Sequence, residues 1–532
     1  MIRETKQNWG VICLGLVVLA SLFAYFAKVL FQQNSYDYVA PLGISFTIIS
    51  AWSYGIVLFH ASRAVKYRFM SFPALRRESQ KHLPPEHLVC LILLYNMPYR
   101  TIRASMYALA SEVQRCGLPT TIYIAGSTQE RIDQEVGIIQ NIFQTFRFDV
   151  QVEVFPFPQV GQGKRHAMST ALKAIARKIS ERNIQNSVAL VMDGDSVLTS
   201  GVFEKTIPLL RHPSKKNGAL TIDNLVNTYR ENWYYTAWNQ LRFLRRNLYL
   251  SSAVTVLTGR FALIDGECLT DPRLEQIIGN DSIDHIIFNK IPLLTGDDKS
   301  TRHYFHTIGK EVLYVPDSYV YCLEHLPLEK VSPTKGKLHK AIVNIKNYFQ
   351  FGIITVMLRV QGNMFRGGYR ELTLGPKKIG FGMWFTYLDQ QIGFWRPLFT
   401  PLLIVFLSFG YGIQLLAAYA FFILFTRSIG VIFMKYVLSF PHEEKSISDI
   451  LKEIFFIPIQ AVILYIDQTL TPVTKIITWW RLDMMRWSRA SVKSEKKFSK
   501  FDLKIRTFGI YITFITLGFV AYATSQGIQI IL

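Results

Sequence analysis

Residues 188–196 read VALVMDGDS, an apolar run that ends in two aspartates separated by a glycine. Three more β-rich runs that end in turn residues occupy 88–94, 120–126 and 150–155, and apolar residues recur at helical spacing over 99–116 and 164–181. Buried strands that alternate with helices predict an α/β domain with a mostly parallel sheet. Ligands bind beyond the carboxyl ends of such strands. We therefore expect the chemistry where these runs stop.

The composition indicates a folded protein with membrane segments. The 532 residues are 50% hydrophobic and 14% aromatic, and the net charge is +21. Such a chain is too apolar to be disordered, and its 32 glycines and 21 prolines exclude a collagen-like or linker-like protein. The five cysteines are far apart and form no CxxC pair, so neither a zinc site nor a redox site is indicated, and a reducing compartment is favoured.

Two apolar stretches near the N-terminus, 10–31 and 39–60, are each long enough to cross a bilayer. A cleaved signal peptide is disfavoured, because the first stretch is too long and the second follows at once. We predict an uncleaved hairpin. The residues after it are rich in cations, which places the N-terminus and the following domain in the cytoplasm by the positive-inside rule. These cations are Arg63, Lys66, Arg68, Arg76, Arg77 and Lys81.

A second membrane region is expected towards the C-terminus. Residues 398–434 have room for two spans that separate at 410–412, and 508–531 form a last span. Residues 475–506 contain ten Lys and Arg residues, so this segment is expected in the cytoplasm. The apolar stretch 453–474 is interrupted by prolines and an aspartate, and we interpret it as interfacial or re-entrant. Five or six spans remain possible.

These features divide the chain into four parts: an N-terminal membrane hairpin (1–61), a cytoplasmic α/β domain (62–335), an interfacial region (336–396) and a C-terminal transmembrane region (397–532). The third part is basic, amphipathic and rich in aromatic residues, as helices at a membrane face are. Nucleic-acid binding would also fit this composition. The flanking spans favour a membrane or carbohydrate surface, with no nucleic-acid partner.

The DGD motif is the first candidate site. Asp193 and Asp195 at a strand end could hold Mg²⁺ or Mn²⁺ against a diphosphate, since these cations prefer hard oxygen ligands. A solvated turn is the alternative. The preceding segment GQGKR contains Gly163, Lys164 and Arg165 and opens a helix, an arrangement that suits an anionic ligand. It lacks the Walker A spacing.

The segment TGDDK supplies the second candidate site. Asp297 and Asp298 are adjacent and repel one another, so one of them could have a raised pKa and act as a base towards an acceptor hydroxyl. A charge pair at a helix N-terminus is the alternative. Lys299 follows the pair. Glu324 and His325 form a further candidate site. The alternative is that His325 is an ordinary hydrogen-bonded histidine with a structural role.

Basic residues complete the candidate set. Arg359 and Arg366 are seven residues apart and would share a helix face, where they could clamp a diphosphate or a sugar carboxylate, or contact lipid headgroups. Arg260 is another possible partner for a buried carboxylate. No Ser/His/Asp order of a hydrolase and no HExxH motif occurs. Nucleotide-sugar transfer explains the set better than a membrane scaffold or channel component does.

In this order, the motifs resemble those of the processive membrane synthases of glycosyltransferase family 2, which include cellulose, chitin and hyaluronan synthases. The sequences of the motifs are most similar to those of the mannuronan synthases, the bacterial alginate polymerases, and the similarity covers nearly the whole chain. The segments that carry it are GKR (163–165), DGDS (193–196), VLTGR (256–260), LTGDDKS (294–300), YVPD (314–317), EH (324–325), GN…R (362–366), LGP (374–376), LDQ (388–390) and WWRLD (479–483). The QxxRW element of cellulose and hyaluronan synthases is absent after residue 340.

The resemblance implies a GT-A-like cytoplasmic domain inserted between transmembrane helices. It implies that the DGD carboxylates hold the metal and the diphosphate. It further implies that Asp298 is the base, that Asp297 and Lys299 assist it, and that Glu324 and His325 are essential in the pocket.

The implied reaction adds mannuronic acid from GDP-mannuronic acid to a growing β-1,4 polysaccharide, with inversion, at the bacterial inner membrane. A cyclic-di-GMP-binding co-polymerase and periplasmic export proteins are the implied partners. A related synthase of another polymer, or transfer of a single sugar to a lipid carrier, is the alternative.

Overall fold

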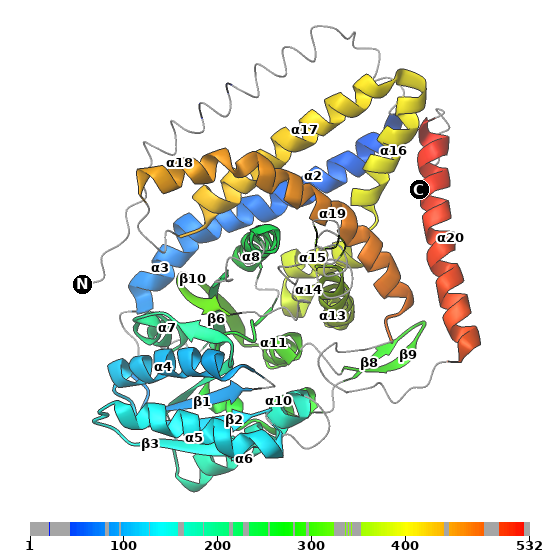
Figure 1. Cartoon of the computed structure of the whole chain (residues 1–532). Helices are drawn as coiled ribbons and strands as arrows, with labels where there is room; N and C mark the ends of the chain where they lie inside the picture. The colour runs from blue at the N-terminus through cyan, green and yellow to red at the C-terminus, as the bar shows by residue number, and fades with distance from the viewer. Residues whose placement is uncertain are drawn as a thin grey trace.

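The computed structural model describes most of the chain and arranges it in two parts (Figure 1). An α/β part lies below a set of long helices, and shorter helices lie between the two. The described residues are 43–79, 84–94, 97–126, 128–157, 164–184, 186–211, 216–226, 233–253, 256–279, 282–293, 297–323, 353–440, 446–483 and 499–525, with the single residues 17, 21, 336, 339 and 342.

The α/β part is built on an eight-stranded sheet with the order β3-β2-β1-β4-β7-β6-β10-β5. Strands β3, β2, β1 and β4 are parallel neighbours, as are β6 and β10, whereas β7 and β5 run antiparallel to their partners. The prediction of a mostly parallel sheet is therefore confirmed. The strands are β1 (His87–Leu93), β2 (Thr120–Ala125), β3 (Val152–Phe157), β4 (Ser187–Asp193), β5 (Ser196–Leu198), β6 (Asn217–Val226), β7 (Ala262–Asp265) and β10 (Glu311–Cys322).

Helices cover both faces of this sheet, because alternate residues of its central strands are apolar on both sides. In β1, Cys90 and Ile92 pack in one cluster, and Val89 and Leu91 pack in the other. The first cluster includes α4 (Tyr99–Cys116), α5 (Gln129–Thr145) and α7 (Val202–Leu210). The second includes α6 (Lys164–Glu181), α9 (Gly266–Leu269), α10 (Pro272–Gly279) and α11 (Asp297–Thr307). Helices α4 and α6 have the bounds that the apolar spacing predicts.

Several elements connect the sheet to the long helices. A hairpin of β8 (Ser282–His285) and β9 (Asn289–Pro292) lies beside them in Figure 1. Helices α13 (Ile353–Thr373), α14 (Gly375–Ile379) and α15 (Phe381–Ile392) lie between the sheet and the long helices. From residue 353 onwards, the region expected to contain interfacial helices is thus helical.

The long helices are α2 (Gly43–Lys66), α8 (Trp233–Ser252), α16 (Arg396–Tyr411), α17 (Ile413–Ile432), α19 (Ile457–Trp480) and α20 (Lys500–Ser525). Among the described residues, two segments are long and apolar enough to cross a membrane, Ile413–Leu438 and Phe501–Ser525. The helices Phe381–Ile392 and Arg396–Gly410 are bent by 46° relative to each other, and they would make a third span if the two together form a single span.

These helices agree in part with the predicted spans. The break between α16 and α17 falls at Gly412, within the predicted separation at 410–412. Helix α2 contains most of the predicted second span, whereas the predicted first span lies outside the described residues except for two positions. The 453–474 stretch forms most of one continuous helix, α19, preceded by the short helix α18 (Ile447–Phe455). Its interfacial or re-entrant placement stays a prediction.

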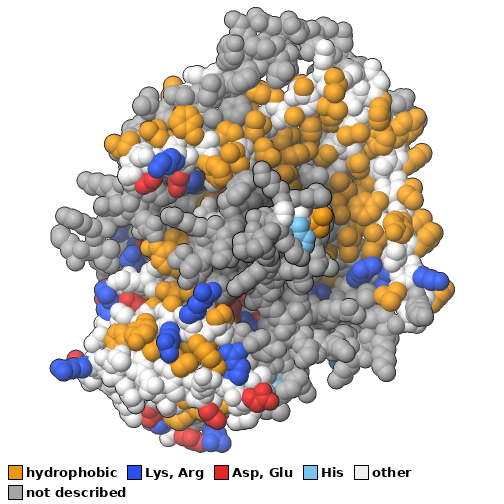
Figure 2. Space-filling view, viewed as in Figure 1, with side chains coloured by type: hydrophobic (Ala, Val, Ile, Leu, Met, Phe, Trp, Pro, Cys, Tyr) orange, Lys and Arg blue, Asp and Glu red, His pale blue; other side chains and the backbone are white. Residues whose placement is uncertain are grey.

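The surface agrees with a membrane-embedded upper part. Figure 2 shows hydrophobic side chains gathered over the long helices, and charged side chains mainly over the α/β part. On the candidate spans, Phe409, Ile413, Phe508 and Ile515 are largely exposed. Large apolar side chains exposed in this number suit a lipid environment.

Candidate active site

The DGD turn lies at the carboxyl edge of the sheet, beside the end of β1. Leu93 of β1 is in register with Asp193 of β4, and the Gly194 amide donates to the carbonyl of Leu93 at 3.0 Å. A Cβ atom at Gly194 would lie 2.1 Å from Leu94 Cδ2, so a larger residue would force the Leu94 side chain to move. The close contact fixes Asp193 and Asp195 at the edge where ligands of parallel sheets bind.

Lys164 joins the two acidic motifs. This residue begins α6, and its Nζ lies 2.7 Å from Asp193 Oδ1 and 3.0 Å from Asp297 Oδ2. The three side chains are 16–27% exposed, so they remain accessible from one side. Segments separated by more than a hundred residues therefore meet at one ammonium group. The GKR, DGD and GDD segments, which the sequence analysis singles out as candidates, thus converge at this place.

The VLTGR segment closes this site from a third side. The Asp193 amide donates to the carbonyl of Gly259 at 2.8 Å, and a Cβ atom at Gly259 would lie 3.0 Å from Asp193 Oδ2. A side chain here would press on the carboxylate. The next residue, Arg260, has its guanidinium carbon 4.9 Å from the centre of the Phe243 ring. Burial and the charge of Arg260 lower the pKa of Arg246 to about 10, so positive charge is concentrated behind this loop.

The pKa values of the two adjacent carboxylates are shifted in opposite directions. Burial acts to raise the pKa of both, but the Lys164 ammonium lowers the pKa of Asp297 below its usual value. The pKa of Asp298 is raised by burial and by the charge of Asp297, although Lys299 opposes this shift. One carboxylate is thus committed to an ion pair, and its neighbour binds a proton more readily. This is the kind of separation that the adjacent carboxylates of the GDD sequence predict.

Lys299 points towards α13. Burial lowers the pKa of Lys299 to about 8, and Asp298 acts in the opposite direction. A Cβ atom at Gly367 of α13 would lie 2.8 Å from Lys299 Cδ, so the lysine stem is packed against this glycine. At neutral pH the ammonium is still charged, and it is available to an anionic ligand or to Asp298.

Two of the predicted ligand-binding arginines are used by the protein itself. Arg165 is 4% exposed, and its guanidinium donates to the carbonyls of Ile277, Ile278 and Leu293 at 2.7–2.9 Å and to Ser300 Oγ at 2.9 Å. These bonds hold the chain around the GDD segment, and the ligand contact that the sequence predicts for Arg165 stays a prediction.

Arg366 is the second arginine of this kind. It is 6% exposed and donates to the carbonyl of Leu482 at 3.0 Å and to Asn363 Oδ1 at 2.8 Å, and burial lowers its pKa to about 10. The expected clamp with Arg359 stays a prediction, because the side chain of Arg359 lies outside the described part.

Three other predicted residues, Gly163, Glu324 and His325, also lie outside the described residues. The last described residue before the EH pair is Leu323, whose amide donates to the carbonyl of Asp195 at 2.8 Å. This contact brings the end of β10 to the DGD turn. The predicted role of the EH pair in the pocket is not tested by it.

The sequence analysis missed one residue that the structure brings near the GDD segment. Glu371 of α13 is 1% exposed and accepts contacts from side chains of α11. A signal was present in the sequence, because Glu371 is the only acidic residue between Glu329 and Asp389, in an otherwise basic region. A glutamate is almost never fully buried unless it is paired, and the surrounding cations offer such partners.

Comparison with known proteins agrees with this geometry. Residues 113–335 match the family model described as glycosyltransferase-like family 2. Over these residues the chain is therefore similar to family 2 glycosyltransferases. The family match begins near the end of α4, whereas the sheet begins earlier, at β1.

The chain is also similar to two curated proteins along most of its length. It is 26% identical over 495 residues to "Glycosyltransferase alg8" of Pseudomonas syringae pv. tomato, covering 92% of this chain and 91% of that protein. It is 26% identical over 483 residues to "Glycosyltransferase alg8" of Azotobacter vinelandii, covering 89% and 88%. The similarity therefore extends beyond residues 113–335 into the long helices.

Among solved structures, the mannosyltransferase PcManGT from Pyrobaculum calidifontis, in complex with GDP-Man and Mn²⁺, matches with a TM-score of 0.41. The identity is 14%, and the match covers 81% of this chain and 95% of that one.

Proposed function

We propose that this protein is a membrane-bound, inverting glycosyltransferase that polymerises mannuronic acid from GDP-mannuronic acid into β-1,4-linked mannuronan, the precursor of alginate. The observation that carries the proposal is the contact of Lys164 with both Asp193 and Asp297, next to Asp298 with its raised pKa. The similarity to the alg8 glycosyltransferases along about nine tenths of the chain supports the same activity.

In the proposed reaction, Asp298 acts as the general base. Its carboxylate takes the proton of the acceptor hydroxyl while the hydroxyl oxygen forms a bond to the anomeric carbon. The bond from that carbon to the diphosphate oxygen breaks on the opposite side, and GDP leaves with the electron pair. Attack opposite the leaving group inverts the anomeric centre. A carboxyl whose pKa is raised by burial accepts this proton more readily than an ordinary aspartate does.

Asp193 and Asp195 would hold the divalent cation, either Mg²⁺ or Mn²⁺. Among the described residues, no group of three or more potential ligands is clustered as in an all-protein metal site. Two carboxylates at a strand end still fit, because Mg²⁺ is usually held by one or two carboxylates together with substrate phosphates. When bound, the cation supplies positive charge to the diphosphate leaving group. Lys164, in contact with Asp193, adds a protein charge at the same place.

The donor sugar carries a carboxylate that must be paired when it leaves water. Lys299 is a candidate partner, since its ammonium lies beside the proposed base and is charged at neutral pH. Arg260 follows the glycine that touches Asp193, and it is the second candidate. A neutral sugar would need neither cation.

We also propose that the long helices help to move the acidic polymer across the inner membrane, with the glycosyltransferase domain on the cytoplasmic side. Arg427 lies in the candidate span Ile413–Leu438. Charged residues within membrane helices face the bundle interior and mark pathways for polar solutes. A cyclic-di-GMP-binding co-polymerase and periplasmic export proteins are the proposed partners.

The test uses the full chain in lipid nanodiscs with Mg²⁺ and a panel of GDP- and UDP-sugars. We expect an acidic polymer from GDP-mannuronic acid alone. Asp298→Asn should lower turnover by about 100- to 10,000-fold, because it removes the base, while GDP binding is retained. Asp284→Asn, at an exposed aspartate of β8, is the matched control and should be fully active.

Other products would contradict the proposal in defined ways. Polymer made only from a different donor would indicate another family 2 synthase. A single sugar on a lipid would indicate transfer to a carrier. An active Asp298→Asn variant would exclude this residue as the base.

A further inference from the structure

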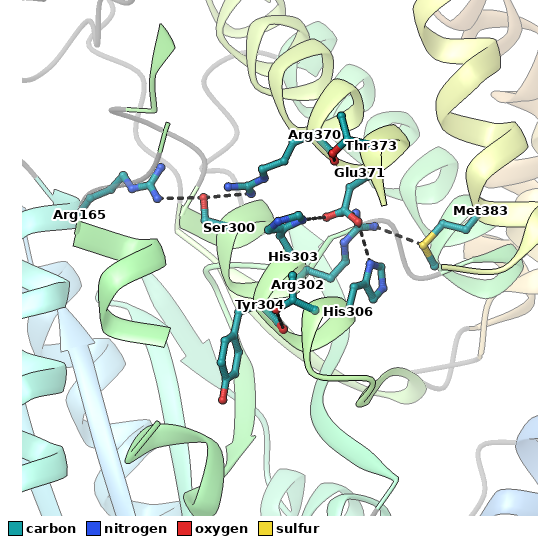
Figure 3. A network of polar contacts seen from close by, with 11 residues as sticks. Arg165, Ser300, Arg302, His303, Tyr304, His306, Arg370, Glu371, Thr373 and Met383 are labelled. Carbon is teal, nitrogen blue, oxygen red and sulfur yellow. Dashed lines mark hydrogen bonds and ion pairs between the residues drawn. The ribbon is translucent and has the colours of Figure 1, made fainter. Parts of the chain in front are cut away.

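Helix α11 has the proposed base in its first turn and three nitrogen-bearing side chains in its later turns (Figure 3). Arg302 Nη2 and His303 Nδ1 lie 3.1 and 3.2 Å from Glu371 Oε1. His306 Nδ1 lies 2.8 Å from Glu371 Oε2. Since Glu371 is near the end of α13, one carboxylate of α13 holds three side chains of α11.

The ion pair at the centre of this network is sealed from water, and the two histidines are 13% and 10% exposed. The side chains of Arg302 and Glu371 are each 1% exposed. Burial alone would raise the pKa of Glu371, but Arg302 and the two histidines hold it well below its usual range, so the carboxylate is ionised. The cost of removing such a pair from water offsets much of its attraction, and apolar side chains could join two helices equally well. Stability alone therefore does not explain why charges are placed here.

The charged contacts fix the orientation of α11 relative to α13, which apolar packing specifies less strictly. Lys299 and His303 are four residues apart and share a face of α11, and Gly367 and Glu371 share a face of α13 in the same way. The Lys299 stem lies against Gly367, and one turn further on, His303 meets Glu371. Two contact levels fix both the rotation and the axial position of α11. They therefore fix the direction of Asp298, the residue before Lys299.

A second branch links the same helix to the start of α6. Ser300 Oγ accepts from Arg165 Nη2 at 2.9 Å and from Arg370 Nη2 at 3.4 Å (Figure 3). Arg165 follows Lys164, the residue that contacts Asp193 and Asp297. Helix α11 is thus connected to α13 through Glu371 and to the nucleotide side of the site through Ser300.

We propose that Glu371 is a positioning residue that orients α11 so that Asp298 meets the acceptor hydroxyl. The inference rests on the proposed function, because it takes Asp298 as the base. Glu371 itself touches neither the DGD turn nor Lys164 among the contacts that the described residues make, so it acts only through α11. Its loss should slow the transfer step and leave donor binding intact.

The test is Glu371→Gln in the full chain in nanodiscs, with polymer formation and GDP binding measured on the same sample. The variant keeps the shape of the side chain and removes its charge. We expect kcat per GDP-binding site to fall about 100-fold, as a small misplacement of a catalytic group can cause. The Kd for GDP and the KM for the donor should stay within about twofold, because Lys164 and Asp193 keep their contacts.

Glu112→Gln is the matched control for loss of a buried carboxylate. Glu112 is 2% exposed and accepts the backbone N–H groups of Gly201 and Val202, each at 2.9 Å. It holds α4 to the start of α7. We expect a lower unfolding temperature and an unchanged kcat per GDP-binding site.

If Glu371→Gln does not fold, His306→Gln tests the positioning role of Glu371 instead. It removes one of three contacts without leaving a buried charge unpaired, so the same loss of kcat at constant Kd is expected, by about tenfold. An unchanged kcat in the variant that folds, or a parallel loss of kcat and GDP binding, would overturn the inference. The proposed function fails separately, through an active Asp298→Asn variant.

Discussion

The two ends of α11 are held by different kinds of charge. At its start, Asp297 meets Lys164 in a group whose side chains are 16–27% exposed. Further along, Arg302 meets Glu371 in a pair that is 1% exposed. Accessible charges can exchange their protein partner for a ligand, whereas sealed charges can only hold geometry. The comparison separates the groups that we propose to bind the nucleotide from those that we propose to orient the base.

The largest effect is expected at the accessible end, for Lys164→Met. The change leaves Asp193 and Asp297 facing each other without a cation and removes a positive charge from the diphosphate site. We expect turnover to fall by about 100- to 1,000-fold, as on loss of one preorganised electrostatic contact. In contrast to Glu371→Gln, the Kd for GDP should rise as well. Both quantities are measured by calorimetry and by polymer assay.

Lys173→Met is the control for this prediction. Lys173 lies on the same helix, is 67% exposed and pairs with Glu275 at 3.2 Å. It should behave as the unchanged chain does. Normal GDP binding by Lys164→Met would show that the accessible end is not the nucleotide end.

Arg165→Lys tests the same distinction on the neighbour of Lys164 in sequence. Arg165 belongs to the buried charges that hold geometry. A lysine keeps the charge but cannot donate to three carbonyls and a hydroxyl at once. We expect a loss of about 2 kcal/mol in stability, on the scale of hydrogen bonds to charged groups. The unfolding midpoint in detergent measures it. A loss of GDP affinity at full stability would instead place Arg165 in the nucleotide site.

The contrast between Lys164 and Arg165 also shows how far the sequence could predict the site. Lys164, Asp193 and Asp297 lie at strand or helix ends, and the order of a parallel sheet brings such ends to one edge. Consecutive residues of a helix point about 100° apart, and here Lys164 is directed at the two acidic motifs while Arg165 is directed at backbone carbonyls. Which of them faces it depends on the packing of α10 and α11, which no local pattern contains.

The sealed end was harder to predict for a related reason. The spacing of Arg302, His303 and His306 indicates one helix face but not its partner. That partner, Glu371, follows after more than sixty residues, and its contact depends on how α13 docks onto the domain. Strands and helices with clear periodicity were predictable. The junction between the domain and the helices above it was not.

Lys299 lies between the two ends, and its loss should appear in the pH profile. The lysine charge lowers the pKa of Asp298, against the effect of burial. A base works only when deprotonated, so turnover falls as the pH drops through its pKa. Lys299→Met should therefore shift the acid limb of kcat to higher pH, by about one unit. Lys299→Arg keeps the charge and should keep the limb in place. A shift to lower pH would contradict the assignment of the base.

The smallest effect is expected at an ion pair outside both ends. Arg76 donates to both oxygens of Asp317, at 2.8 and 2.5 Å, with side chains 23% and 24% exposed, and so ties α3 (Phe72–Glu78) to β10. Asp317→Asn should lower stability by about 0.5 kcal/mol, since water and salt screen a partly exposed pair, and leave kcat and the Kd for GDP unchanged. The pair of Arg177 and Glu181 is 80% and 58% exposed, so Glu181→Gln should have no measurable effect. A drop in kcat for Asp317→Asn would mean that α3 also helps to orient the base. Contacts outside α11 would then contribute to the orientation that we assign to the contacts of α11 alone.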